Sequence, residues 1–377
     1  MSTTTEETKP VRRVRKPKAE VQRHALEAFI PDEWMATDYV SRNLYGIPDA
    51  AILDTAAELM HNVIIAGPTG SAKTSLVYAF AAGFVGEKKR RKVDGVMTDV
   101  NFVDPTKRRP LIYIPCNGAV TPDQLFGSWV PSDSGSFNFV PGEVLLGVIL
   151  GAGIYGDEIN FLATKIAAVL HGLLDKRRTI IYKDARGAGL CHDCAFVNGS
   201  SAYKPQLKAT DPLFTCTRCG AENHTDTVFV AHKDTFFIAA YNPGYRGTNP
   251  LNEAFLNRFA IKINFPYDRD IEQEMVYSER LIDMAFQLRA SYEAGDIEVP
   301  VSTSMLLEFE AFALNPKLGF SFAVENFLNA FGPGERQAVS NVMQVNAAQI
   351  MADLTDEEPD EDADEEYIDT DDDEADA

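Results

Sequence analysis

Short apolar runs alternate, over the first 268 residues, with segments whose apolar residues recur at helical spacing. The runs are rich in β-branched residues, as buried parallel strands are. The expected strands are 62–67, 111–116, 153–157, 235–242 and 260–265. Helical spacing follows at 74–85 and around Ile166, Val169, Leu170, Leu173 and Leu174. This alternation predicts an α/β fold with a central parallel sheet flanked by helices.

Beyond Tyr267 the pattern becomes helical. Apolar residues recur at helical spacing in 268–295, 303–315 and 320–349. With 377 residues, the chain is long enough to form two packed units. We therefore expect an α/β core over residues 25–268 and a separate helical region over residues 269–352.

The charges gather at the two ends of the chain. Residues 353–377 hold sixteen Asp or Glu and no Lys or Arg, so the rest carries only −5 of the net charge of −21. Residues 1–24 hold seven Lys or Arg against three Glu. This composition predicts a disordered basic arm over 1–24 and a disordered acidic tail over 353–377. The arm and the basic run 88–91 are interpreted as solvated loops, with nucleic-acid binding as the alternative.

No segment of the sequence favours a membrane location. The longest apolar run, 144–154, has eleven residues, which is too few to cross a bilayer. The basic N-terminal residues have no apolar stretch behind them, so they do not form a secretion signal. We expect a cytoplasmic protein that makes no contact with a membrane.

The stretch AGPTGSAKTS, residues 66–75, lies between the first expected strand and a helix. It matches the phosphate-binding pattern G-x-x-x-x-G-K-[ST] except that Ala72 replaces the second glycine. Alanine is expected to fit there with ordinary helical dihedral angles. In such a turn the backbone N–H groups face the phosphates, the lysine reaches the β- and γ-phosphate oxygens and the threonine ligates Mg²⁺. The predicted ATP-binding residues are Gly67, Pro68, Thr69, Gly70, Ser71, Ala72, Lys73, Thr74 and Ser75, and Thr74 is also a predicted magnesium ligand.

A pair of carboxylates, Asp157 and Glu158, ends the third expected strand. Ligands of α/β sheets bind at the carboxyl ends of the strands, where the phosphate loop also lies. Asp157 is therefore predicted to bind ATP through its Mg²⁺, and Glu158 to orient the attacking water.

Four cysteines form a second site. Cys191 and Cys194 make one C-x2-C pair, and Cys216 and Cys219 make another after 21 intervening residues. This spacing is typical of a tetrahedral structural zinc site, and zinc is preferred over two disulfides in a cytoplasmic protein. The segment 185–226 is predicted to be a zinc-knuckle insertion, at the tip of a hairpin formed by 178–184 and 227–234. Cys116 is interpreted as a buried apolar residue.

The phosphate loop, DEIN (157–160), YNPGYRG (241–247) and LNRF (256–259) together resemble the MoxR branch of the AAA+ ATPases, particularly its CbbQ/NorQ type, over roughly residues 45–350. The resemblance implies an AAA+ core, a helical lid at 269–352 and a ring oligomer, with a hexamer as the expected size. It also implies that Asn242 is the sensor of the γ-phosphate and that Arg258 is the arginine finger of the neighbouring subunit's site. The family's lid arginine has no counterpart in 318–331.

The family also implies a hairpin that faces the pore of the ring and touches the client. Apolar arms around Trp129 and around Phe137 and Phe139 flank a Ser/Gly turn, as in a hairpin; burial of these aromatic residues in the core is the alternative.

By this resemblance the protein hydrolyses ATP to remodel a client protein, often with a von Willebrand A-type partner. One alternative is the motor subunit of a metal-chelatase-like complex, similar to CobS. Another is a nucleic-acid-dependent ATPase, which the cysteine knuckles and the basic arm favour. A scaffold that binds ATP without hydrolysis is disfavoured, because Lys73, Thr74, Asp157, Glu158 and Arg258 are all present.

Overall fold

The computed structural model describes residues 26–93, 96–133, 135–204, 206, 208, 210–243 and 251–356. The predicted basic arm, most of the predicted acidic tail and part of the YNPGYRG motif (244–247) lie outside the described residues. The chain forms two compact units, Met1–Tyr267 and Asp268–Ala377. Within the described residues, no helix combines the length and the apolar character needed to cross a membrane.

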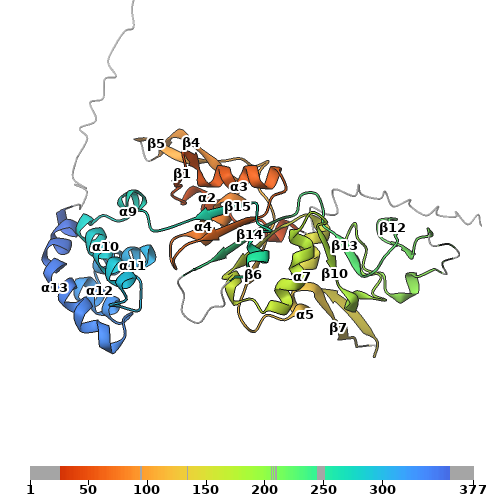
Figure 1. The fold of residues 1–377 in the computed structure, drawn as a ribbon. Coiled ribbons are helices and arrows are strands. Elements are labelled where there is room, and N and C mark those ends of the chain that lie inside the picture. The colour runs from red at the N-terminus through yellow and green to blue at the C-terminus, as the bar shows by residue number, and fades with distance from the viewer. Residues whose placement is uncertain are drawn as a thin grey trace, which may run out of the picture. The chain divides into compact units, whose positions relative to one another are not determined.

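The first unit is built on a five-stranded sheet in the order β15-β3-β14-β9-β6. Three of these strands, β15, β14 and β6, are labelled in Figure 1. Every neighbouring pair in it is parallel. The strands are β3 (Val63–Ala66), β6 (Leu111–Pro115), β9 (Gly153–Asp157), β14 (Phe236–Tyr241) and β15 (Ile261–Asn264). The predicted central parallel sheet is confirmed, and each strand falls within a range expected from the sequence.

Helices cover both faces of this sheet because its strands are apolar on both sides. Val63 and Ile65 of β3 belong to one buried cluster, which includes residues of α3 (Asp49–Glu58) and α4 (Lys73–Ala81). Ile64, between them in β3, belongs to a second cluster with residues of α6 (Glu143–Leu150) and α7 (Thr164–Leu174). Alternation along a single strand therefore places one helical layer on each face, which gives a three-layered α/β unit.

The register of the sheet brings the carboxyl ends of its strands to one edge. Tyr241, the last residue of β14, is paired with Ala66, the last residue of β3. On the other side of β14, Ala239 is paired with Gly156, just before the end of β9 at Asp157. Segments that begin after residues 66, 157 and 241 therefore leave the sheet side by side.

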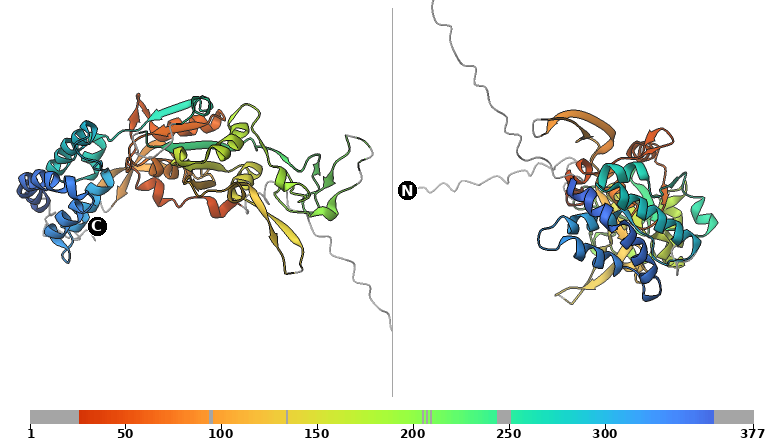
Figure 2. Two further views of the ribbon diagram at one scale, coloured as in Figure 1. Left: turned by 60° about the horizontal axis from the view of Figure 1, so that its bottom comes forward. Right: turned by 90° about the vertical axis from the view of Figure 1, so that its left-hand side faces the viewer.

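Three of the antiparallel strand pairs in the described part of the first unit bear on expectations from the sequence. The strands β7 (Gly127–Pro131) and β8 (Phe137–Pro141) pair with Trp129 opposite Phe139, which confirms the predicted hairpin (yellow in Figure 2). The strands β10 (Thr179–Ile181) and β13 (Val228–Val230) pair with Ile180 opposite Phe229, which confirms the predicted stem of the cysteine insertion.

The third hairpin corrects an expectation. Residues 88–91, interpreted as a solvated loop, lie in β4 (Phe84–Val93), which pairs with β5 (Val96–Val103). Arg90 lies opposite Asp99, and the ammonium group of Lys89 lies 3.0 Å from the centre of the Phe102 ring. Cross-strand pairing of opposite charges and a cation–π contact favour extended backbone in a run that composition alone suggests is a loop.

Short elements complete the first unit. They are η1 (Glu27–Phe29), α2 (Trp34–Thr37), β1 (Asn43–Leu44), β2 (Ile47–Pro48), α5 (Pro122–Phe126), η2 (Ile159–Phe161), η3 (Lys183–Ala185), η4 (Ser200–Ala202), β11 (Phe214–Thr215), β12 (Glu222–Asn223) and α8 (Glu253–Leu256).

The second unit is helical, with α9 (Arg269–Met275), α10 (Glu279–Ala294), α11 (Thr303–Ala313), α12 (Gly319–Leu328) and α13 (Pro333–Asp356) around one apolar cluster. A buried ion pair links two of its helices: the guanidinium of Arg289 donates to both carboxylate oxygens of Glu272, at 2.8 and 2.6 Å.

The last helix runs through Asp356, past the point at which the sequence placed the start of the acidic tail. Leu354 is buried in the helical cluster. Asp353 accepts hydrogen bonds from the hydroxyl of Ser278 at 2.7 Å and from the backbone N–H of Arg280 at 3.3 Å. The first four residues of the predicted tail, 353–356, therefore belong to the helical unit.

Candidate functional site: the phosphate loop and a four-cysteine cluster

The loop between β3 and α4 is fixed at its start by close contact between backbones. The N–H of Gly67 donates to the carbonyl oxygen of Tyr241 at 3.1 Å, and the N–H of Phe265 donates to that of Ala66 at 2.7 Å. A Cβ atom at position 67 would lie 2.2 Å from the carbonyl oxygen of Phe265. Glycine is required here because any side chain would collide with a neighbouring strand.

Ala72 does not have the helical dihedral angles expected from the sequence. It precedes α4 with φ 68° and ψ 24°, in the left-handed region. Left-handed backbone brings Cβ close to a carbonyl oxygen, which costs alanine about 1–2 kcal/mol. The glycine of the motif pattern thus corresponds to a real backbone requirement, and this chain meets it with a strained alanine.

Lys73 opens α4 and turns back over the loop. Its Nζ donates to the carbonyl oxygens of Gly67 and Pro68, at 2.9 and 2.6 Å. Burial lowers the pKa of Lys73 to about 8, although the charges of Asp157 and Glu158 oppose this effect. The ammonium group therefore lies inside the loop that is predicted to hold phosphates.

The two predicted magnesium ligands meet at the end of β9. The hydroxyl of Thr74 donates to Oδ2 of Asp157 at 3.1 Å, while Oδ1 accepts from the backbone N–H of Glu158 at 3.0 Å. Glu158 is exposed and has φ 53°. A non-glycine residue in left-handed backbone is strained, and such strain gathers at functional sites.

Asn242 also reaches the loop. Its side-chain amide donates to the hydroxyl of Thr69 at 3.0 Å, and its carbonyl oxygen accepts from the amide of Asn160 at 3.3 Å. Asn160 is buried, and its Oδ1 has no hydrogen-bond partner within the described residues. Asn242, which directly follows β14, therefore lies next to the phosphate loop.

Arg258 lies at the other end of the sheet. Its carbonyl oxygen accepts from the amide of Asn62, which immediately precedes β3, at 3.4 Å. The four residues of β3 then separate this position from the phosphate loop by about 13 Å. The Arg258 side chain lines a cavity of about 390 Å³ with His61 and Phe236 among its other walls. The structure therefore does not bring Arg258 into the site of its own chain.

Arg42, which is not among the predicted site residues, also holds the phosphate loop. Its buried guanidinium donates to the carbonyl oxygen of Ser71 at 2.7 Å and also to that of Pro266. It stacks 4.0 Å from the centre of the Phe265 ring. No local pattern marks Arg42, because its partners lie far along the chain.

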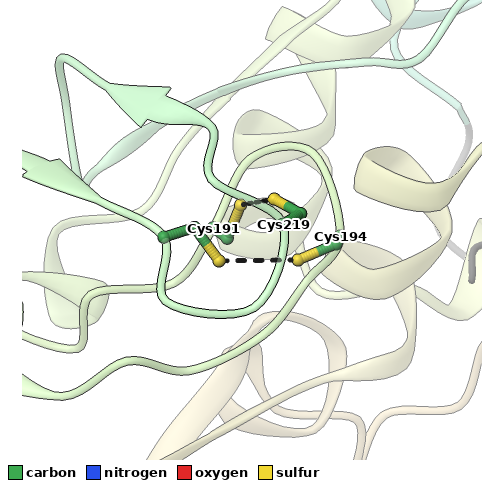
Figure 3. A group of neighbouring side chains, drawn as sticks. Cys191, Cys194 and Cys219 are labelled. Carbon is green, nitrogen blue, oxygen red and sulfur yellow. Dashed lines mark hydrogen bonds between the residues drawn. The ribbon is translucent and has the colours of Figure 1, made fainter. Parts of the chain in front are cut away.

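The four predicted cysteines converge at the tip of the β10–β13 stem (Figure 3). Their sulfur atoms all lie within 4.8 Å of one another, with Cys191 and Cys219 at 3.6 Å and Cys194 and Cys216 at 3.7 Å. Four sulfurs about 2.3 Å from a central zinc ion would be about 3.8 Å apart, whereas the sulfurs of a disulfide are about 2.05 Å apart. The donor set fits a tetrahedral metal site. The hydrogen bond between Cys191 and Cys194 lowers the pKa of Cys191 and raises that of Cys194, because one thiol of the pair keeps the proton.

The base of the cysteine insertion touches the aromatic hairpin. The hydroxyl of Tyr182, just after β10, donates to the carbonyl oxygen of Gly127 at 2.6 Å. The indole N–H of Trp129 donates to the carbonyl oxygen of Asp184 at 2.8 Å. The two elements are thereby joined at their bases by two hydrogen bonds.

Ser71, Gly70, Ser75 and Cys116 are the other residues for which the sequence made a prediction. The hydroxyl of Ser71 donates to the carbonyl oxygen of Pro68 at 2.9 Å, Gly70 has φ 68°, and Ser75 lies in the first turn of α4. Cys116 is buried with its pKa raised to about 12, chiefly by burial, as expected for an apolar-like residue.

Relatives of this chain are found among bacterial proteins. An uncharacterized protein of Staphylococcus saprophyticus is 26% identical over 72% of this chain and 86% of its own length. The uncharacterized protein YojN of Bacillus subtilis is 27% identical over 70% of this chain and 74% of its own length. The crystal structure of a protein from Cytophaga hutchinsonii aligns with 90% of this chain and with 96% of its own chain, at 15% sequence identity and a TM-score of 0.36. A TM-score this low supports no inference.

The family model that matches covers more than half of the chain. It is the AAA domain of the dynein-related subfamily, and it matches residues 62–259. That range begins just before β3 and ends one residue after Arg258, so it contains the phosphate loop, Asp157, Glu158 and Asn242. The chain belongs to the dynein-related subfamily of AAA domains.

Proposed function

We propose that this chain is an ATP-hydrolysing AAA+ motor of the MoxR type that works as a ring, with a hexamer as the expected size. The proposal rests chiefly on one observation. Lys73, Thr74 and Asp157 meet at the carboxyl edge of the sheet, while Arg258 lies at the amino edge. The proposed phosphate site and the proposed arginine finger would thus belong to opposite ends of one subunit, an arrangement that suits a ring of identical subunits.

Nucleotide binding would draw on groups that are already in place. The N–H groups at the start of α4 face the loop, and Lys73 can exchange the carbonyls of Gly67 and Pro68 for the β- and γ-phosphate oxygens. Phosphate is the better partner, because an ammonium group binds an anion more strongly than a neutral carbonyl.

Hydrolysis would use the carboxylates at the end of β9. Thr74 and Asp157 would hold Mg²⁺, which neutralises charge on the transferred phosphoryl group when bound. Glu158, which is exposed next to this pair, would orient the attacking water. Asn242 would register the γ-phosphate through its contact with Thr69. Arg258 of a neighbouring subunit would stabilise the transition-state charge.

The cysteine cluster would hold one structural Zn²⁺. All four donors come from the chain, so no coordination position remains for a reacting water. The insertion would serve contact with a partner, a client or a neighbouring subunit. The client role, and a von Willebrand A-type partner, follow from the family resemblance alone.

Two variants test the ATPase. Lys73→Ala should lose nucleotide binding, because it removes the cation inside the loop. Glu158→Gln should bind ATP normally and turn over at least ~100-fold more slowly. The matched control is Lys165→Ala, on an exposed position of α7, which should behave as wild type. Full turnover by Glu158→Gln would remove Glu158 from its proposed role.

The same Glu158→Gln protein can identify what the motor acts on. With ATP bound and turnover blocked, it should retain its client during affinity capture, whereas Lys73→Ala should not. ATPase activity that DNA or RNA stimulates would favour a nucleic-acid-dependent motor instead. Activity that depends on a metal-inserting partner would favour the chelatase-like alternative.

A further inference from the structure

The hydroxyl of Thr74 is held from two sides. Its Oγ1 lies 3.1 Å from Oδ2 of Asp157 and 3.1 Å from the hydroxyl oxygen of Tyr155. A threonine hydroxyl has one hydrogen to donate and two lone pairs, whereas a carboxylate can only accept. Thr74 therefore donates to Asp157 and accepts from Tyr155, which leaves one lone pair on Oγ1 for another partner.

Burial and ring packing hold the Tyr155 side chain in this contact. It lies in β9, fully buried, two residues before Asp157. Because side chains two apart on a strand point to the same face, both reach toward α4 and Thr74. Its ring packs against that of Tyr113, which is its direct partner on β6, with ring centres 5.7 Å apart. A buried, packed tyrosine gives the threonine hydroxyl a fixed orientation.

The other nearby tyrosine is less well placed. The hydroxyl of Tyr113 donates to Oδ2 of Asp157 at 3.4 Å, and 37% of the Tyr113 surface is exposed. A long hydrogen bond open to water contributes little, because water can replace it. Of the two tyrosines, Tyr155 is the one whose hydroxyl contacts the threonine, at 3.1 Å, and that hydroxyl also interacts with the Asp157 carboxylate.

We propose that Tyr155 is a positioning residue for the magnesium ion: it orients the Thr74 hydroxyl so that the remaining lone pair points at the metal. The inference rests on the proposed function, since it concerns the same nucleotide site. Tyr155 acts through Thr74 and touches neither nucleotide nor metal. Its loss should weaken the binding of Mg²⁺ while leaving intact the contacts between phosphate and Lys73.

The test compares nucleotide binding with and without the metal. The dissociation constant of a fluorescent ATP analogue is measured in excess EDTA and during a Mg²⁺ titration. Tyr155→Phe should raise the Mg²⁺ midpoint about three- to tenfold, as expected for one lost hydrogen bond, and leave the affinity in EDTA within about twofold of wild type. Tyr78→Phe, a tyrosine of α4 whose ring lies 6.4 Å from that of Tyr113, is the matched control and should shift the midpoint less than about twofold.

A double variant shows whether Tyr155 acts through Thr74. Thr74→Ala should raise the midpoint by itself, and adding Tyr155→Phe to it should cause no further rise. An unchanged midpoint in Tyr155→Phe would overturn the inference, and so would equal losses of affinity with and without Mg²⁺, which indicate a structural role. A wild-type protein whose nucleotide binding is insensitive to Mg²⁺ would instead contradict the proposed function.

Discussion

The side-chain amide of Asn62 donates a hydrogen bond to the backbone carbonyl oxygen of Arg258, at 3.4 Å. Asn62 comes just before β3, and the phosphate loop comes just after it. This contact shows that Arg258 lies at the opposite edge of the sheet from the phosphate loop of the same chain. Under the proposed function, Arg258 would therefore complete the nucleotide site of another subunit.

Mixing two inactive variants tests that relationship. Arg258→Ala should bind ATP but turn over at least ~100-fold more slowly, because the transition-state charge loses its cation. Combined with Glu158→Gln subunits, it should regain part of the activity, since some interfaces then pair an intact Glu158 with an intact Arg258. Steady-state phosphate release at several mixing ratios is the measurement. Full-rate hydrolysis by a protein that stays monomeric with ATP would contradict action between subunits.

Ala72→Gly should stabilise the protein. Glycine relieves the strain of left-handed backbone, but it also gives the unfolded chain more freedom, so we expect a net gain of about 0.5–1 kcal/mol. Chemical denaturation gives the free energy of unfolding. Ala79→Gly, at a buried helical position of α4, is the control and should destabilise. A loss of stability in Ala72→Gly would mean that position 72 is not left-handed in solution.

Removal of the metal should change the surroundings of Trp129 in the β7–β8 hairpin. We expect one zinc ion per chain, measured by elemental analysis of protein purified without added metal. A chelator should release it, loosen the cysteine insertion and shift the fluorescence of Trp129. The indole N–H of Trp129 donates a hydrogen bond to the backbone carbonyl oxygen of Asp184, close to the end of β10. The measurement uses a Trp34→Phe background, because the chain has only two tryptophans.

Nucleotide binding should survive this treatment, and so should binding by a variant with Cys191 and Cys194 changed to serine. Cys116→Ser is the control, since Cys116 lies outside the cluster. Two disulfides in place of zinc, or unchanged Trp129 emission on chelation, would each count against this account.

Two truncations separate the helical unit from the acidic tail. Ending the chain after residue 356 should leave the melting temperature unchanged. Ending it after residue 352 should destabilise the helical unit by about 2–3 kcal/mol, because it removes buried Leu354 and the carboxylate that accepts from Ser278. Thermal unfolding of the two proteins makes the comparison. Equal melting temperatures would mean that residues 353–356 do not pack on the helices.

Local patterns were enough to predict much of this protein. Strands such as β3 and β9 were found because buried parallel strands are continuous apolar runs, a property each segment carries by itself. The phosphate loop and the cysteine pairs were found because their chemistry needs particular residues at fixed spacing. The β7–β8 hairpin was predictable because it joins two apolar segments close in sequence, and the β10–β13 stem because two β-branched runs flank the cysteine insertion.

The tertiary structure decided what depends on residues far apart in the chain. The strand order brings Asn242 to Thr69, 173 residues away, and places Tyr155 against Thr74, 81 residues away. Arg42 supports the loop through contacts with Ser71 and Pro266, which no local pattern can reveal. The left-handed backbone of Ala72 is imposed by the loop and by the strands that fix its start, against alanine's own preference. A sequence states which groups are available, and only packing determines which of them meet.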